Sequence, residues 1–544
     1  MMQATMMHEP LGTASIVEHG ERIHATSRIG LYDGKAVTWR SFAETARRAR
    51  QLASALQSAG VSANTRVATL SWNDFAHFEA YLAIPAMGAV LHTLNLRLHP
   101  EQLAFIMQDA GDAFLIADGA LLADLIEEVN ALRAMERVVV TGDASGLEKL
   151  EKPWIAYEDF IAGHDPLASF PTIDETAAAA TCYTSGTTGD PKGVVYSHRT
   201  VHLHSLGSMA ANAFALTDRD RILLMPPMFH ANAWGLPFSG WLAGADFVLP
   251  GPHLGPDAIR DMIKLTAPTF TATVPTILND LLRADEADPL DMSSFRVIVG
   301  GGSAISQKLI SEVDRRWSVP LIQGWGMTET SPVCVLSHPA ADAEGEEAYR
   351  LQAKSGRPVA GVRVRIVDEE GKVLPEDGET VGRLQLRGIW IARGYHGSAH
   401  DDVRTEDGWL DTGDAGTIDE RGYVQVTDRL KDLIKSGGEW IPSAELENII
   451  SGLPGIDLAA VIGIPDERWE ERPLAIVTTK GDVPPDFASL RGALRDRVAR
   501  FWIPEYWSHS QSLPLTTVGK IDKQGLRKAL ASSKIRVERV DEFR

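Results

Sequence analysis

The sequence predicts a large multi-layer α/β domain followed by a small α+β domain. The chain has 544 residues, too many for one compact core at about 100–200 residues per domain. Through most of the first 430 residues, short apolar strand-like runs alternate with helix-like stretches, which is typical of α/β layers. A charged segment, Asp428–Asp432, interrupts this pattern. We therefore expect one domain over residues 1–430 and a second over residues 431–544.

One unit of the large domain can be followed in detail. Phe295–Val299 is an apolar run typical of a buried strand, and glycines 300–302 follow it. One face of the next predicted helix carries the apolar residues Leu309, Ile310, Val313 and Trp317. A short strand beginning at Leu321 then ends at Gly324–Gly326. Glycines at strand ends lie where open α/β sheets bind ligands, so we expect a binding site here.

The region beyond residue 428 predicts shorter elements. Along Tyr423–Thr427, just before this charged segment, apolar and polar residues alternate as in a half-exposed strand. After it we expect a helix over 443–451, strands near 458–464 and 473–479, and a helix near 487–500. This mixture is typical of a small α+β domain.

Composition excludes several classes of protein. The net charge is −20 and no basic stripe is present, so we expect no nucleic-acid partner. No apolar run reaches 18 residues and the amino terminus lacks a secretory signal, so we expect no membrane span. Cys182 and Cys334 are too few for a disulfide framework or a zinc site of their own. We expect both to be buried thiols in a reducing, cytoplasmic compartment.

The strongest local signal is a run of hydroxylated residues and glycines before Lys192. The run comprises Thr184, Ser185, Gly186, Thr187, Thr188 and Gly189. Glycines let the backbone approach a polyphosphate, successive N–H groups can form an anion site, and the lysine adds positive charge. The segment is not a Walker motif, because Gly193 follows the lysine. From composition alone, a mobile polar surface loop is an equally good interpretation.

Three further segments carry candidate chemistry. Trp325 stands between two glycines and can offer a flat face to a base, while Glu329 can bind Mg²⁺ through oxygen. Asp414 ends an Asp-Thr-Gly-Asp run and can accept hydrogen bonds from ribose hydroxyls. Lys520 follows a glycine on a loop before the last predicted helix. Taken singly, the Asp414 segment is typical of an ordinary turn and Lys520 of a solvated lysine, and a turn with a buried tryptophan is the alternative for Trp325.

Together, five segments in one order resemble the adenylate-forming superfamily. They are residues 184–193, 323–330, 409–414, 428–440 and 516–523. The superfamily contains acyl- and aryl-CoA synthetases, peptide-synthetase adenylation domains and luciferases, and the resemblance covers nearly the whole chain. Phe229–Trp234 and Asp428–Trp440 are most similar to the fatty acyl-CoA synthetase branch, which includes 3-methylmercaptopropionate-CoA ligases. The implied fold is that of an adenylate-forming enzyme, with a mobile small domain.

The resemblance implies an acid–thiol ligase that uses ATP, Mg²⁺ and coenzyme A. A carboxylate reacts with ATP to give an acyl-adenylate and pyrophosphate, and CoA then takes the acyl group and releases AMP. Lys520, Glu329 and His230 take the catalytic positions, Thr184 and Glu329 hold Mg²⁺, and Lys431 is the hinge. The residues implied for ATP are those of 184–189 with Lys192, Gly302, Ser303, Gln323, Gly324, Trp325, Gly326, Met327, Thr328, Asp414, Arg429, Lys435 and Trp440. Those implied for the acid are His230, Trp234, Gly301, Gly302 and Pro332.

The acid and the acceptor are less tightly defined. We expect an apolar-tailed monocarboxylic acid, either short to medium such as 3-methylmercaptopropionate, or a longer fatty acid. The main alternative is a stand-alone adenylation enzyme that loads a carrier protein. A luciferase-like oxygenase and a degenerate nucleotide-binding module are further alternatives, although a pure binder would not need Lys520. The resemblance also implies a homodimer.

Overall fold

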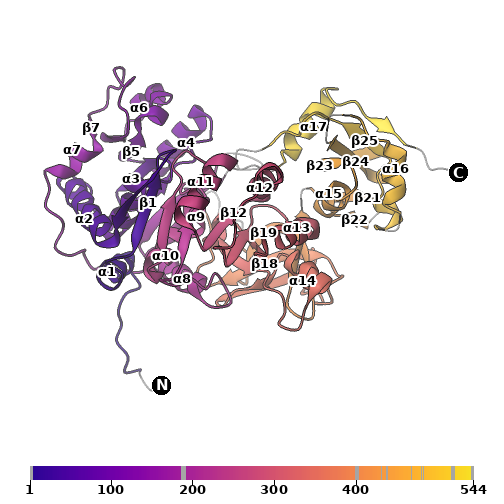
Figure 1. The fold of residues 1–544 in the computed structure, drawn as a ribbon, viewed down its shortest axis with the longest axis horizontal. Helices are drawn as coiled ribbons and strands as arrows, with labels where there is room; N and C mark the ends of the chain where they lie inside the picture. Colours follow the sequence, from indigo (N-terminus) through magenta and orange to yellow (C-terminus); the bar gives the residue numbers. More distant parts are fainter. Residues whose placement is uncertain are drawn as a thin grey trace.

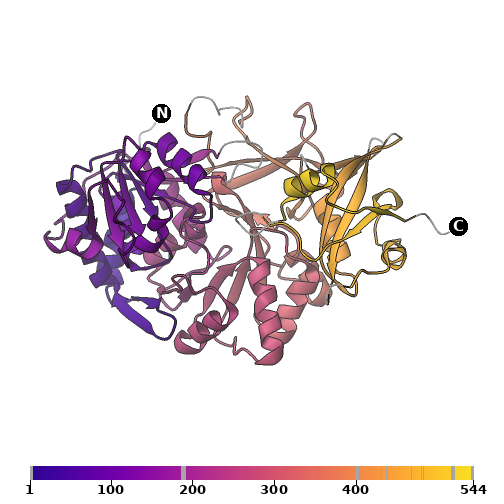
Figure 2. The same cartoon turned by 90° about the horizontal axis from the view of Figure 1, so that it is seen from above.

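A computed structural model of the chain shows a large body and a smaller lobe at one end (Figures 1 and 2). The described residues are 4–184, 191–397, 404–430, 432–436, 439–466, 468–479, 481, 483–495, 497–515 and 521–540, with backbone only for 439 and 440. In this part of the chain no helix is long and apolar enough to cross a bilayer.

The first large sheet has nine strands in the order β16-β15-β14-β13-β12-β10-β11-β1-β2. Their bounds are Arg28–Tyr32 (β1), Val37–Ser41 (β2), Arg221–Leu223 (β10), Asp246–Leu249 (β11), Phe270–Thr273 (β12), Val297–Gly300 (β13), Leu321–Gly326 (β14), Val333–Leu336 (β15) and Arg357–Pro358 (β16). Strands β1 and β10 to β14 pair in parallel, so their carboxyl ends share one edge. The segments that follow β12, β13 and β14 therefore meet at that edge.

The second large sheet has seven strands in the order β7-β6-β5-β3-β4-β8-β9. Their bounds are Arg66–Leu70 (β3), Val90–Thr93 (β4), Phe114–Asp118 (β5), Arg137–Thr141 (β6), Trp154–Ala156 (β7), Ala178–Tyr183 (β8) and Gly193–Ser197 (β9). All neighbours pair in parallel except β8 and β9, which form an antiparallel hairpin. The predicted phosphate loop is the loop of this hairpin.

Helices pack between and outside the two large sheets. The inner helices are α1 (Thr13–Ile23), α2 (Phe42–Ser58), α3 (Phe75–Ala86), α7 (Tyr157–Ala162), α8 (His198–Met209) and α10 (Leu236–Ala243). The outer ones are α11 (Pro256–Thr266), α12 (Pro275–Ala287), α13 (Gln307–Trp317) and α14 (Gly345–Gln352) by the first sheet, and α4 (Pro100–Ala110), α5 (Gly119–Ala123) and α6 (Ile126–Ala131) by the second. The result is a five-layered body.

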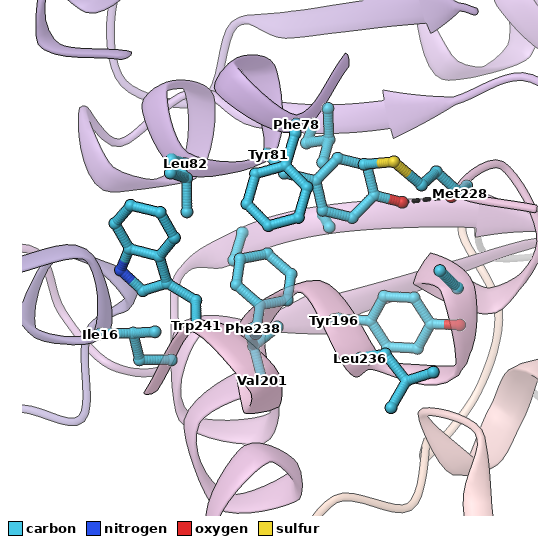
Figure 3. Packing of buried hydrophobic residues seen from close by; sticks show 14 of the residues in the cluster. Ile16, Phe78, Tyr81, Leu82, Tyr196, Val201, Met228, Leu236, Phe238 and Trp241 are labelled. Carbon is cyan, nitrogen blue, oxygen red and sulfur yellow. Dashed lines mark hydrogen bonds between the residues drawn. The ribbon is translucent and has the colours of Figure 1, made fainter. Parts of the chain in front are cut away.

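The centre of the body is an aromatic core between the sheets. Trp241 of α10 is fully buried and stacks on Phe42 of α2, with ring centroids 4.0 Å apart. Figure 3 shows Trp241 and Phe238 facing Phe78 and Tyr81 of α3 across this core. Such packing of large rings fixes the two sheets relative to each other, and so fixes the loops at their edges.

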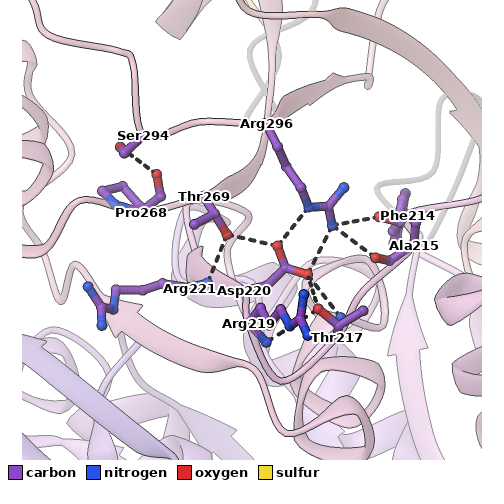
Figure 4. A network of polar contacts seen from close by, with 10 residues as sticks. All are labelled: Phe214, Ala215, Thr217, Arg219, Asp220, Arg221, Pro268, Thr269, Ser294 and Arg296. Atoms are coloured by element: carbon purple, nitrogen blue, oxygen red, sulfur yellow. Dashed lines mark hydrogen bonds and ion pairs between the residues drawn. The ribbon is translucent and has the colours of Figure 1, made fainter.

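A polar network fixes the opposite edge of the nine-stranded sheet, where strands begin. Asp220, just before β10, accepts hydrogen bonds from Arg296 and Thr269, which precede β13 and β12 (Figure 4). Burial alone would raise the pKa of Asp220, but these bonds and one from Thr217 outweigh it and lower the pKa. The network is structural, because it lies away from the carboxyl ends of the strands.

The remaining sheets complete the body and build the lobe. An antiparallel four-stranded sheet contains Val362–Val367 (β17), Gly382–Gly388 (β18), Leu410–Ile418 (β19) and Val424–Arg429 (β20). The lobe has a six-stranded sheet of Ile434–Ser436 (β21), Glu439–Ile441 (β22), Ile456–Asp466 (β23), Glu470–Thr479 (β24), Tyr506–His509 (β25) and Glu538–Arg539 (β26). Its helices are α15 (Ser443–Ser451), α16 (Phe487–Ala493) and α17 (Lys523–Ala531). The predicted boundary at residue 431 lies between β20 and β21 and stays a prediction.

Most elements expected from the sequence are present. The four apolar residues expected on one helical face, Leu309, Ile310, Val313 and Trp317, are all buried in α13. Helix α15 spans 443–451 as expected, and strands β13, β14, β20, β23 and β24 overlap their predicted ranges. The helix expected near 487–500 is wrong in length, since α16 ends at Ala493 and a separate 3-10 turn covers Arg500–Trp502. Gly492 at the end of α16 is a weak helix former, which favours the early stop.

Candidate active site

The phosphate-loop hairpin is closed at its base by backbone pairing. Tyr183 of β8 lies opposite Gly193 of β9, and the Thr184 N–H donates to the Lys192 carbonyl at 2.9 Å. A Cβ atom at Gly193 would lie 2.9 Å from the Tyr183 ring, so a larger residue would force the ring or the backbone to shift. Five predicted ATP-binding residues of the loop lie outside the described residues: Ser185, Gly186, Thr187, Thr188 and Gly189.

Tyr395 joins the end of this loop to Glu329. The Lys192 ammonium group lies 5.1 Å from the centre of the Tyr395 ring, and the Tyr395 hydroxyl donates to the Glu329 carboxylate. Burial and the neighbouring carboxylate raise the pKa of Tyr395 well above its usual value, so its hydroxyl is a donor at neutral pH. Sequence analysis missed Tyr395, and the only signal for it was its place between Gly394 and Gly397 in a segment without periodicity.

Glu329 is held rigidly in a short 3-10 turn, Thr328–Thr330. It is 4% exposed, and its carbonyl accepts from the Ala392 N–H at 2.8 Å. The Thr328 carbonyl accepts from the Tyr196 hydroxyl at 2.7 Å. The carboxylate oxygen atoms of Glu329 suit a hard cation such as Mg²⁺. Among the described residues no group of three His, Cys, Asp or Glu side chains could hold a metal ion.

The ends of β13 and β14 form the next part of the site. Gln323 lies opposite Gly300, and its side-chain oxygen accepts from the Ile305 N–H at 2.5 Å. Because Ile305 follows the predicted residues Gly301, Gly302 and Ser303, this bond ties their loop to β14. Gly302 has a φ of +82° and is exposed, so glycine suits both the backbone and the open space.

The aromatic segment of β14 is fixed through its backbone. The Trp325 carbonyl accepts from the Cys334 thiol at 3.3 Å, and the ring is half-buried. A side chain at Gly326 would collide with the Pro332 carbonyl, which brings the predicted acid-site proline against the predicted nucleotide segment. This segment comprises Gln323, Gly324, Trp325, Gly326, Met327 and Thr328.

Trp234 lies beside this edge, on a turn of unexpected hand. Sequence analysis put His230 and Trp234 on one face if the segment is helical, but Ala231–Trp234 (α9) all have positive φ, between +43° and +60°. Left-handed backbone costs about 1–2 kcal/mol for each such residue, so tertiary contacts must hold it. A Cβ atom at Gly301 would lie 2.9 Å from the Trp234 ring and 3.0 Å from the Gly324 carbonyl. The structure therefore brings Trp234, Gly301 and Gly324 together.

Asp414 and Arg429 face each other on neighbouring strands. They are paired in register between β19 and β20, and the Arg429 Nε lies 2.8 Å from an Asp414 carboxylate oxygen. The Asp414 side chain is 3% exposed, whereas that of Arg429 is 40% exposed. The arginine thus orients a buried carboxylate at the junction with the small lobe.

The small lobe carries the other predicted residues. The Lys435 ammonium group on β21 lies 3.4 Å from the Glu470 carboxylate, within the lobe itself. Trp440 lies opposite Lys435 across β21 and β22, and its side chain is outside the described part of the chain. Lys431 and Lys520 are also outside the described residues, so their predicted roles are untested.

Comparison with known proteins matches the chain to a family along its length. Residues 17–396 match the AMP-binding enzyme family, and residues 445–520 match the AMP-binding enzyme C-terminal domain. The chain belongs to the AMP-binding enzyme family. A long-chain-fatty-acid–CoA ligase of Thermus thermophilus is 41% identical over 96% of both chains. A 3-methylmercaptopropionyl-CoA ligase of Ruegeria pomeroyi is 39% identical over 97% of this chain and 98% of its own.

A solved structure agrees with this assignment. The anthranilate CoA ligase AuaEII in complex with anthranoyl-AMP superposes with a TM-score of 0.86 at 25% identity, covering 98% of this chain and 100% of that one. The predicted superfamily, its acyl-CoA synthetase branch and the fold are thereby confirmed. This AMP-binding enzyme is an ATP-dependent acid–thiol ligase that uses ATP, Mg²⁺ and CoA, also as predicted.

Proposed function

We propose that the acid is an apolar-tailed monocarboxylate: a short or medium one such as 3-methylmercaptopropionate, or a fatty acid. The observation that carries this proposal is the contact of the Trp234 ring with Gly301 at the end of β13. Beside it, the space at Gly302 is bounded by a Val274 methyl group, 3.1 Å from where a Cβ would stand. Ring, glycines and valine make an apolar wall, which suits an aliphatic tail. The two ligases named above act on acids of this kind, which supports the proposal.

In the first half-reaction the acid's carboxylate oxygen attacks the α-phosphorus of ATP, and the bond to the departing pyrophosphate breaks. Both reactants are anionic, so positive charge is needed where they meet. We assign this role to Lys520, with Lys192 and the loop of residues 184–189 at the β- and γ-phosphates. Thr184 and Glu329 would hold Mg²⁺, which when bound neutralises phosphate charge. His230 would border the acid's carboxylate.

The nucleotide would occupy the two strand ends beside these groups. Asp414 and Arg429 are suited to the ribose, because a buried, oriented carboxylate can accept hydrogen bonds from hydroxyl groups. Ser303 and residues 323–328 would line the base, where Trp325 offers a partly exposed ring. Gly302 and Pro332 lie where nucleotide and acid would meet.

In the second half-reaction the CoA thiolate attacks the acyl carbonyl and AMP leaves. We propose that the small domain rotates about Lys431 between the two steps and brings residues 437–440 to the thiol. Lys435 and Trp440 would then join the nucleotide site. Hinge motion of this kind requires only a few loop residues to change backbone angles.

The direct test is acid-dependent AMP release by the purified protein with ATP and Mg²⁺. The panel is C2–C16 acids plus 3-methylmercaptopropionate, with and without CoA. We expect release that requires CoA and is greatest for one apolar-tailed acid. Pyrophosphate exchange without stimulation by CoA would instead favour the alternative, an adenylation enzyme that loads a carrier protein. Equal release without any acid would contradict both.

Lys520→Ala tests the assignment of the adenylation lysine. We expect adenylate formation to slow by about 10²–10³, because one well-placed electrostatic donor is lost. Thioester formation from supplied acyl-AMP should change far less. Single-turnover assays of each half-reaction measure the two effects. Lys528→Ala, on the exposed face of α17, is the matched control and should alter neither step. Equal losses in both steps for Lys520→Ala would refute the assignment.

We further propose a cytoplasmic homodimer. The free, buried thiols of Cys182 and Cys334 support a reducing compartment. The dimer rests on the family resemblance. Sedimentation equilibrium at several protein concentrations tests it, and a monomer at all of them would exclude it.

A further inference from the structure

The left-handed turn that carries Trp234 is anchored through Asn232. Asn232 is 6% exposed, and its side-chain oxygen, 3.3 Å from the Tyr81 hydroxyl, shares that donor with the Met228 carbonyl. The Cys182 thiol also donates to this oxygen, at 3.4 Å. Asparagine tolerates positive φ better than most residues do. Asn232 therefore suits the turn in backbone and side chain alike.

The anchoring groups come from three rigid elements. Tyr81 lies on α3 and Cys182 on β8, and both are fully or almost fully buried. The Cys182 sulfur also lies 3.3 Å from the Thr93 hydroxyl at the end of β4. Figure 3 shows the Tyr81 hydroxyl reaching the carbonyl of Met228, just before the turn. Helix α3 and strands β4 and β8 of the seven-stranded sheet thus hold the turn in place.

The far end of the turn is held by packing. The Gly235 N–H donates to the Asn232 carbonyl at 2.9 Å and closes the turn. A Cβ atom at Gly235 would lie 2.5 Å from the buried His204 ring, so the chain fits closely against α8. Between these two anchors stands Trp234, whose half-buried ring lies against Gly301.

We propose that Asn232 is a positioning residue that sets acid selection by fixing the left-handed turn and thereby the seat of Trp234 over Gly301. The inference rests on the proposed function, in which Trp234 and Gly301 wall the acid site. Asn232 acts through Trp234: its own amide is buried in the polar group formed by Tyr81, Cys182 and Thr93. If the anchor is lost, the turn relaxes and the ring no longer holds one position.

The test is a double-mutant cycle on acid preference. We make Asn232→Ala, Asn232→Gly, Trp234→Ala and the two doubles with Trp234→Ala, and measure kcat/KM for a short and a long acid. Each Asn232 single variant should change the ratio between the acids by about tenfold, with KM for ATP nearly unchanged. In the Trp234→Ala background the same substitution should add little, because both act on one ring.

The glycine variant separates backbone from anchor. Glycine adopts positive φ without strain but lacks the amide. An altered acid ratio in Asn232→Gly supports anchoring by the side chain, and a wild-type ratio overturns the proposal. Asn64, with a φ of +66° on an exposed turn before β3, gives the matched control: Asn64→Ala should leave the acid ratio unchanged.

Further outcomes are equally decisive. If Asn232→Ala does not fold, Tyr81→Phe and Cys182→Ala remove the donors instead and should shift the acid ratio in the same direction; no shift overturns the proposal. An additive effect in the Trp234→Ala background also overturns it. If Trp234→Ala itself leaves the acid profile unchanged, the proposed acid wall fails together with the inference. A shift with Trp234→Ala alone refutes only the role of Asn232.

Discussion

At the scale of single residues, Tyr395 links the two halves of the proposed phosphate site. A buried carboxylate such as Glu329 is costly unless hydrogen bonds compensate for lost water. The Tyr395 hydroxyl supplies one such bond, and its ring faces the Lys192 ammonium group at 5.1 Å. Partners that orient a metal-binding carboxylate affect metal affinity without binding the metal. Tyr395 should therefore act on Mg²⁺ through Glu329.

Tyr395→Phe keeps the ring against Lys192 but removes the donor to Glu329. We expect the Mg²⁺ concentration for half-maximal activity to rise by about tenfold, because the carboxylate loses its fixed orientation. Steady-state rates over a Mg²⁺ titration measure the effect. Tyr349→Phe removes a similar Tyr–carboxylate bond, to Asp314 on the outer helices, and should leave the titration unchanged. An unchanged titration for Tyr395→Phe would separate Tyr395 from the metal site.

The site residues that could be predicted from the sequence are those that stand in segments of distinctive local composition. Lys192, Glu329 and Asp414 stand in glycine- and hydroxyl-rich segments, and in the structure Tyr395 contacts Lys192 through its ring and Glu329 through its hydroxyl. Tyr395 and Asn232 could not be found in this way. Each acts through a partner far along the chain, and no local pattern encodes which distant carboxylate or thiol a side chain will meet.

At the scale of elements, α1 depends on a glycine to approach α10. A Cβ atom at Gly20 would lie 2.2 Å from the Nε1 atom of Trp241, which itself donates to the Val17 carbonyl. Trp241 is fully buried and stacked on Phe42, so it has no room to move. The contact between α1 and the Trp241 ring thus favours glycine, although glycine is the poorest helix former after proline.

Gly20→Ala should therefore destabilise the protein although alanine is the better helix former. Overpacking of a buried ring costs about 1–3 kcal/mol, more than the gain of about 1 kcal/mol in propensity. Hydrogen exchange of α1 and the apparent melting temperature measure it. Gly492→Ala in α16 is the matched control of opposite sign, because nothing lies within 4 Å of its Cβ position. Slower exchange in α1 of Gly20→Ala would contradict the steric argument.

Most helices and strands could be predicted from the sequence, but the left-handed turn at residues 231–234 could not. The apolar face of α13 follows from a 3.6-residue period, since burial of one face selects that spacing. The left-handed turn at 231–234 has no such signature, because its strain is compensated by contacts with α3, β8 and α8 rather than by its own sequence. The early end of α16 was likewise a local effect that periodicity does not register.

At the scale of the whole molecule, an exposed ion pair is one of the contacts between the lobe and the body. In Figure 1, α17 lies on the side of the lobe that faces the body, whereas β21 and β22 lie on the far side. Arg283 of α12 reaches Asp457 of β23 at 2.7 Å, and the side chains are 57% and 30% exposed. Exposed ion pairs contribute about 0–1 kcal/mol, so this contact can break at little cost. The arrangement suits a lobe that changes its orientation.

A cross-link between residues 283 and 457 should hold the lobe in this arrangement. Helix α17, which follows Lys520 in the sequence, lies on the side toward the body, so we expect adenylate formation to persist. Thioester formation should be lost, because residues 437–440 could no longer reach the thiol. Arg283→Cys with Asp457→Cys, joined by a cleavable bis-maleimide, provides the link, and the native cysteines are buried. Cleavage should restore CoA-dependent turnover, and each single cysteine variant should be fully active. If the linked enzyme completes both half-reactions, rotation about Lys431 is not required for catalysis.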